Sequence, residues 1–81
     1  MDEATQRKRI RHIVETISYR IDMAKKRNEP KLFYVYNGEF ILDVVIILQR
    51  MYRNTAVVSR TPEGIVAHFM SWHSSNGRLE D

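Results

Sequence analysis

The sequence contains no cysteine, which excludes a disulfide framework and a thiolate metal site. It also lacks a long apolar run, because the longest, residues 44–48, is far shorter than the roughly 20 residues that a membrane-spanning helix needs. The N-terminus is charged where a signal peptide would be apolar. We therefore expect a protein of a reducing compartment, the cytoplasm, with no membrane contact.

The residue patterns of common catalytic and cofactor sites are also missing. The three histidines, His12, His68 and His73, do not stand at ligand-like spacing from one another or from a carboxylate. The three glycines are too scattered for a phosphate-binding loop, and no G-x-S-x-G motif marks a nucleophilic serine. We therefore expect neither an enzyme nor a metal or cofactor site.

What the sequence does contain is enough apolar material for one modest core. Its 81 residues, 43% hydrophobic and 28% charged, are typical of a folded domain of this size. We expect a single domain over 1–81, with an ordered body at about 4–73. Residues 74–81 are polar and predict a flexible tail.

The central segment, residues 39–53, holds the largest share of apolar side chains. On a helix they form one broad face, whereas the charged residues fall on the other side. The predicted core-facing residues are Phe40, Ile41, Val44, Val45, Ile47, Leu48, Met51 and Tyr52.

A β-hairpin is the alternative for the start of this segment. Asn37-Gly38 lies between two apolar runs, which is a strong hairpin signal. As a strand, however, residues 39–48 would carry large apolar side chains on both faces, whereas the helix accommodates all but Leu42 and Ile46. The pattern therefore favours a helix over 39–53 with Asn37 as its N-cap, and the branched residues keep the strand open as an alternative.

Residues 2–28 predict a first helix. Its apolar residues recur every three or four positions and form one narrow stripe, so only one side of the helix should pack. Pro30 prevents continuation, and basic residues occupy the predicted last turn. The stripe consists of Ile10, Ile13, Val14, Ile17, Ile21 and Ala24.

Three segments predict strands: 31–36, 55–60 and 65–72. They are rich in branched and aromatic residues, and residues 61–64, Thr-Pro-Glu-Gly, have the pattern of a type I turn joining the last two. If the first two strands are parallel neighbours, their crossover should be right-handed. The expected fold is a two-layer α+β domain of order α-β-α-β-β, with two helices on one face of a three-stranded sheet.

This architecture leaves apolar residues that need a cover. Leu42 and Ile46 form a second row along the central helix with Gln49 and Arg53. Either the first helix covers this row or it meets another subunit or partner. The uncovered sheet face, with residues 33–36 and 69–72, is the second candidate interface. We therefore expect a homodimer, and a small non-enzymatic cytoplasmic regulator or inhibitor that acts by protein–protein binding.

The alternative function is nucleic-acid binding. The chain has a net charge of +3, and Arg9, Arg20 and Arg27 align along one flank of the first helix. Arg60 beside the predicted turn would extend this surface. Arginines beside an apolar stripe also commonly pack their stems over the core edge, which is the structural explanation of the same pattern.

Overall fold

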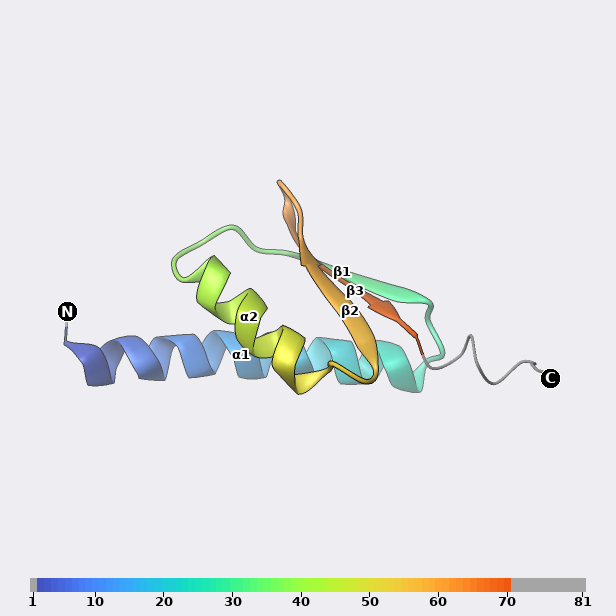
Figure 1. Cartoon of the computed structure of the whole chain (residues 1–81), viewed down its shortest axis with the longest axis horizontal. Helices are drawn as coiled ribbons and strands as arrows, with labels where there is room; N and C mark the ends of the chain where they lie inside the picture. Colours follow the sequence, from blue (N-terminus) through green and yellow to red (C-terminus); the bar gives the residue numbers. More distant parts are fainter. Residues whose placement is uncertain (1, 71–81) are drawn as a thin grey trace.

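The computed structural model describes residues 2–70 (Figure 1). Its elements follow the predicted order α-β-α-β-β, and the predicted α+β fold class is confirmed. The predicted end of the body at 71–73 and the predicted tail at 74–81 lie outside the described residues. The elements are α1 (Glu3–Lys26), β1 (Lys31–Val35), α2 (Ile41–Met51), β2 (Ala56–Arg60) and β3 (Gly64–Phe69).

Helix α1 is the longest element and runs beneath the rest of the molecule (Figure 1). Its first turn is capped by Asp2, whose carboxylate accepts a hydrogen bond from the backbone N–H of Thr5 at 2.8 Å. Asn28 takes a left-handed conformation, with φ of 61°, just after the helix. The predicted stripe is confirmed: its middle and C-terminal members are buried, whereas Ile10 and Ile13 are half-buried.

Helix α2 confirms the helical interpretation of the central segment over the hairpin. The predicted Asn37 cap is wrong, because the helix begins at Ile41 and Phe40 is its N-cap, with φ of 63° and no side-chain capping bond. Asn37 instead donates its side-chain amide to the carbonyl of Pro62 at 3.4 Å. The chain therefore enters α2 through a bulky residue in the left-handed region, which only the surrounding packing can hold there.

The core face of α2 matches the prediction except at its C-terminal end. Met51 was predicted to face the core, but its side chain is about half exposed. The next residue, Tyr52, is buried as predicted, and its hydroxyl reaches α1, where it donates to Asp22 Oδ1 at 2.9 Å and lies 3.2 Å from the Ser18 carbonyl. Tyr52 therefore closes the contact between the two helices at this end.

The sheet has the strand order β1-β3-β2, with every neighbouring pair antiparallel. β1 and β2 are thus parallel to each other but are not neighbours, because β3 inserts between them. Residues 61–64 form the predicted hairpin turn: Thr61 and Gly64 exchange backbone hydrogen bonds at 2.7 and 3.2 Å. Neither Pro62 nor Glu63 has positive φ, which fits the predicted type I turn.

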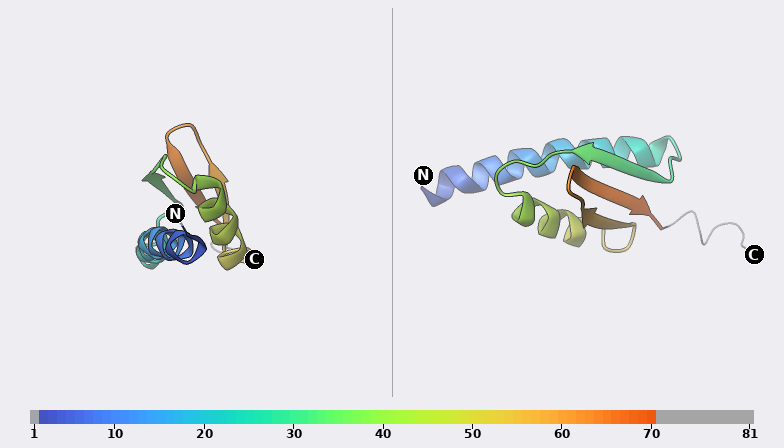
Figure 2. Two further views of the ribbon diagram at one scale, coloured as in Figure 1. Left: turned by 90° about the vertical axis from the view of Figure 1, so that its left-hand side faces the viewer. Right: turned by 90° about the horizontal axis from the view of Figure 1, so that it is seen from above.

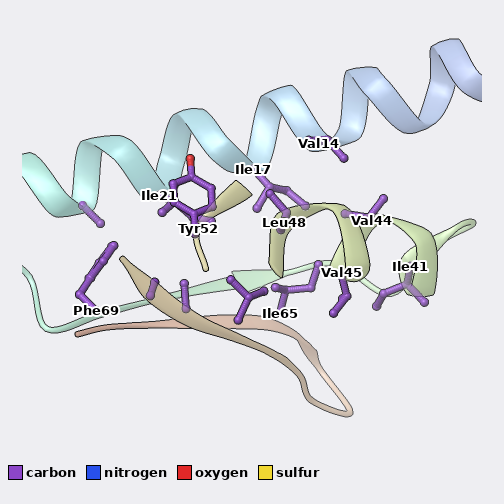
Figure 3. Packing of buried hydrophobic residues seen from close by; sticks show 14 residues of the cluster. Val14, Ile17, Ile21, Ile41, Val44, Val45, Leu48, Tyr52, Ile65 and Phe69 are labelled. Carbon is purple, nitrogen blue, oxygen red and sulfur yellow. The ribbon is translucent and has the colours of Figure 1, made fainter. Parts of the chain in front are cut away.

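Both helices pack on the same face of the sheet, and within residues 2–70 no other element covers the opposite face, as the end-on view of Figure 2 shows. The core lies between these two layers, and its buried residues come from every element except β1, which adds the half-buried Leu32 and Tyr34 (Figure 3). In β2 and β3 the buried positions alternate with exposed or half-buried ones, as expected for a sheet covered on one side only.

Candidate functional site

The uncovered face of the sheet carries exposed apolar side chains. Phe33, Val35 and Val57 expose 45%, 75% and 50% of their surface. Val66 of the central strand is half-buried between them, since its register partners are Phe33 on β1 and Ser59 on β2. We call this surface the open sheet face; it consists of Lys31, Phe33, Val35, Val57, Ser59, Val66 and His68.

This composition corrects part of the predicted sheet interface. Of residues 33–36 and Phe69, only Phe33 and Val35 lie on the open face, because side chains alternate along a strand. Met70 follows β3 and still bonds to Thr55, and the same alternation places it in phase with Val66 and His68. Tyr34, Tyr36 and Phe69 pack toward the helices instead. Residues 71–72 of the predicted interface lie outside the described residues.

The predicted helix row remains uncovered by α1. Leu42 and Ile46 are exposed on α2, and Arg53 is exposed just beyond it. Gln49, the fourth member, has a structural role, because its side-chain amide donates to the carbonyl of Val58 at 3.0 Å. The row therefore offers two adjacent apolar side chains, next to a glutamine that is already engaged.

The Gln49 contact shows that α2 covers the outer edge of β2. Along this edge strand, alternate residues direct their backbone groups toward β3, as the bond from Met70 N–H to Thr55 O at 2.8 Å indicates. The residues between them, which include Ala56 and Val58, direct their backbone N–H and C=O groups away from β3. Tyr52 O accepts from Ala56 N–H at 2.8 Å and Gln49 donates to Val58 O, so α2 and its C-cap engage one outward backbone group of each of these two residues.

The outer edge of β1 has no such cover. The bond from Phe69 N–H to Pro30 O, at 3.0 Å, sets the alternation along this pair. Lys31, Phe33 and Val35 therefore direct their backbone N–H and C=O groups away from β3. Within residues 2–70, no other segment forms a hydrogen bond with these groups. We call them the β1 edge.

The aligned arginines of α1 lie on the side of the helix that faces β1. The Arg20 guanidinium carbon lies 5.6 Å from the centre of the Tyr34 ring, and Arg9 pairs with Glu39 in the loop after β1 at 3.4 Å. Arg27, whose guanidinium is 3.9 Å from Glu29, completes the row that we call the cationic flank. Arg60 lies on β2, at the opposite edge of the sheet from β1, and does not extend this flank.

A groove of about 430 Å³ lies between the N-terminal half of α1 and the loop that leads into α2. Its polar groups hold that loop: the Tyr36 hydroxyl donates to the Glu39 carbonyl at 2.6 Å, and Arg9 pairs with the Glu39 carboxylate. Burial, followed by the charge of Glu39, raises the pKa of Tyr36. The groove is lined by Thr5, Lys8, Arg9, His12, Ile13, Tyr36, Glu39 and Phe40.

The described part of the chain contains neither a cluster of metal-binding side chains nor a membrane-spanning helix. Among residues 2–70, no three histidine, aspartate or glutamate side chains gather as a metal site requires. None of the described helices combines the length and apolar character needed to cross a membrane. Comparison of the chain with protein-family models, with curated proteins and with solved structures finds no match.

Proposed function

We propose that the protein acts by binding another protein, without catalysis, as a small regulator or inhibitor, and that it forms a homodimer through the open sheet face. The observation that carries this proposal is the half to three-quarters exposure of Phe33, Val35 and Val57 on one side of a single-layer sheet. Exposed apolar side chains that gather on one side of a sheet, in place of being scattered singly over the surface, are a feature of interaction sites.

The open sheet face has more support as the dimer contact than the helix row does. It presents apolar side chains from all three strands, including the half-buried Val66 at its centre. The helix row presents Leu42 and Ile46 alone, beside Gln49, which is bound to β2. Two flat sheet faces can also pack against each other about 10 Å apart, as in a β-sandwich.

The small size of the face implies a weak dimer. Three strands of about five residues, with a spacing of about 4.8 Å and a rise of about 3.4 Å, give a footprint of roughly 250 Å². Stable interfaces bury about 800 Å² on each partner, and smaller ones belong to transient complexes. We therefore expect a dissociation constant in the micromolar range, which suits a regulator that exchanges partners.

Nucleic-acid binding by Arg9, Arg20, Arg27 and Arg60 stays a prediction with less support. Arg9 and Arg27 each lie beside a carboxylate, which lowers the positive potential that a phosphate backbone would meet. The cytoplasmic location likewise stays a prediction.

Light scattering over a concentration series tests the proposal, with one lysine variant on each candidate surface. Val35→Lys places a charge in the open sheet face and should yield a folded monomer. Ile46→Lys is the matched control, because it adds the same charge at another exposed apolar position and should leave the dimer intact. A monomer of 9.6 kDa for the unmodified protein at high micromolar concentration would overturn the proposal, as would dissociation by Ile46→Lys alone.

A further inference from the structure

We propose that the β1 edge binds an extended acidic segment of another protein as a fourth strand, and that the cationic flank of α1 selects its acidic side chains. The binding site is the edge of the sheet rather than its open face. It therefore stands independently of the proposed dimer, and the two can be tested separately.

The two edges of the sheet differ in how their outward backbone groups are covered. At the β2 edge, α2 and its C-cap bond to the outward N–H of Ala56 and the outward C=O of Val58. At the β1 edge, the outward groups of Lys31, Phe33 and Val35 meet no other segment within residues 2–70. Proteins generally cover or block edge strands, because an uncovered edge pairs with other extended chains. An edge of this kind is the docking site in β-strand addition.

The cationic flank lies beside this edge. Arg20 lies against Tyr34 of β1, and Arg9 reaches the loop that follows β1. In the end-on view of Figure 2, β1 lies above one side of α1 and α2 lies above the other side. A strand added outside β1 would therefore run above the arginine side of α1, with every second side chain directed toward it.

These two features together define the chemistry of the occupant. Its side chains on the helix side would meet the cationic flank and should be Asp or Glu. The side chains of the bound segment on the opposite side would extend the open sheet face beside Phe33 and Val35, and they should be apolar. Arg20 and Arg27 are separated by about 10 Å along the helix. Side chains on one face of a strand recur about every 7 Å, so two acids on that face can approach both arginines, the one at Arg27 in competition with Glu29.

Charge also argues against a second copy of this chain at the same edge. Two-fold pairing of β1 with its own copy would bring the two cationic flanks toward each other, with Arg20 facing the Arg20 of the copy. Like charges facing each other across an interface are unfavourable, and the chain carries a net charge of +3. An acidic partner strand removes this repulsion.

The experiment uses the full chain and a labelled peptide, acetyl-Thr-Glu-Val-Glu-Val-Glu-Thr-amide, followed by fluorescence anisotropy at low salt. The control peptide carries lysine in place of each glutamate and should bind at least tenfold more weakly. Two further peptides carry N-methyl groups on alternate amides. One of them should lose binding and the other should retain it, because an added strand directs only every second N–H toward β1.

Protein variants test the flank, with one arginine of the same helix as control. Arg20→Gln should weaken binding about threefold, as expected for one exposed ion pair. Arg11→Gln, on the side of α1 toward Ile47, should leave the affinity unchanged. In amide hydrogen exchange by NMR, the outward N–H groups of Lys31, Phe33 and Val35 should become protected when the peptide binds.

Several outcomes would overturn the proposal. Equal binding of the glutamate and lysine peptides would remove the role of the flank, and equal loss with both N-methylated peptides would remove the strand geometry. If a short single-stranded oligonucleotide binds as tightly as the peptide and depends on Arg20, the flank is a general polyanion site. A dimer that dissociates with Val35→Lys while the peptide fails to bind would disprove this inference and leave the proposed function standing.

Discussion

The hydroxyl of Tyr52 should contribute measurably to stability, because it joins the end of α2 to the middle of α1. The ring is 9% exposed, and the hydroxyl donates to the Asp22 carboxylate; Figure 3 shows it directed toward α1. Tyr52→Phe removes only this oxygen. Since Asp22 is itself exposed to water, the loss should not exceed the lower limit of the range for a bond to a charged group and should be about 1–1.5 kcal/mol at pH 7.

The same contact predicts a dependence on alkaline pH. Burial, followed by the hydrogen bond and charge of Asp22, raises the pKa of Tyr52 to about 12. The folded state thus favours the neutral phenol. The contribution of the Tyr52 hydroxyl to the free energy of unfolding is therefore complete below the unfolded pKa near 10. It is lost as the pH rises through 12. If the whole shift in pKa were converted into stability, the free energy of unfolding would fall by about 2.7 kcal/mol over this pH range. Solvent screening at Asp22 should reduce this loss to roughly half.

Urea unfolding at pH 7 and at several values between pH 9 and 12 measures both effects. Tyr19→Phe is the matched control, because Tyr19 is 63% exposed, and it should change the free energy of unfolding by less than about 0.5 kcal/mol. The pKa of Tyr36 is also raised, so the relevant quantity is the difference between the parent protein and Tyr52→Phe. Equal effects of Tyr52→Phe and Tyr19→Phe at pH 7 would refute this account of the helix contact. So would a Tyr52→Phe variant whose free energy of unfolding falls at alkaline pH as much as that of the parent protein.

Two further substitutions test the core. Val44→Asp should prevent folding, because it places a carboxylate at a fully buried position at a cost of several kcal/mol. Asp43→Ala, at an exposed position of the same helix, should lower the free energy of unfolding only slightly. Equal urea midpoints for the two variants would contradict the core assignment. Gly64→Ala should destabilise the hairpin by at least about 2 kcal/mol, because the added methyl group would clash with the Tyr34 carbonyl oxygen. A circular-dichroism melting curve like that of the parent protein would contradict this close approach.

Local signals were enough to predict the elements and their order. The apolar spacing of α1 and α2 identified both helices, and Thr61 to Gly64 identified the hairpin turn, because these signals are local. Leu42 and Ile46 were also correctly singled out as residues that the amphipathic pattern of α2 does not accommodate. Asn37 failed as the helix cap because packing of the loop placed Phe40 there instead, a tertiary effect that overrides a local preference.

The arrangement of the surfaces depends on contacts between distant residues and could not be predicted. Insertion of β3 between β1 and β2 decides which strands are edges, and no local pattern encodes it. Likewise, the pairing of Arg9 with Glu39 and of Gln49 with the Val58 carbonyl joins separate elements. Alternation along β1 predicts that Tyr34 and Phe33 lie on opposite faces of the sheet. It does not predict which of the two faces is covered, because that depends on where the helices pack.

The central claim is that two copies of the chain meet through the open sheet face, and the absence of cysteine allows a direct test. Val66→Cys places a single thiol at the centre of this face, where a two-fold axis between stacked sheets should pass. Ile46→Cys places one in the helix row. Treatment with a short bifunctional maleimide at micromolar protein should cross-link Val66→Cys into a dimer and leave Ile46→Cys monomeric. Cross-linking of Ile46→Cys alone, or of neither variant, would contradict the claim.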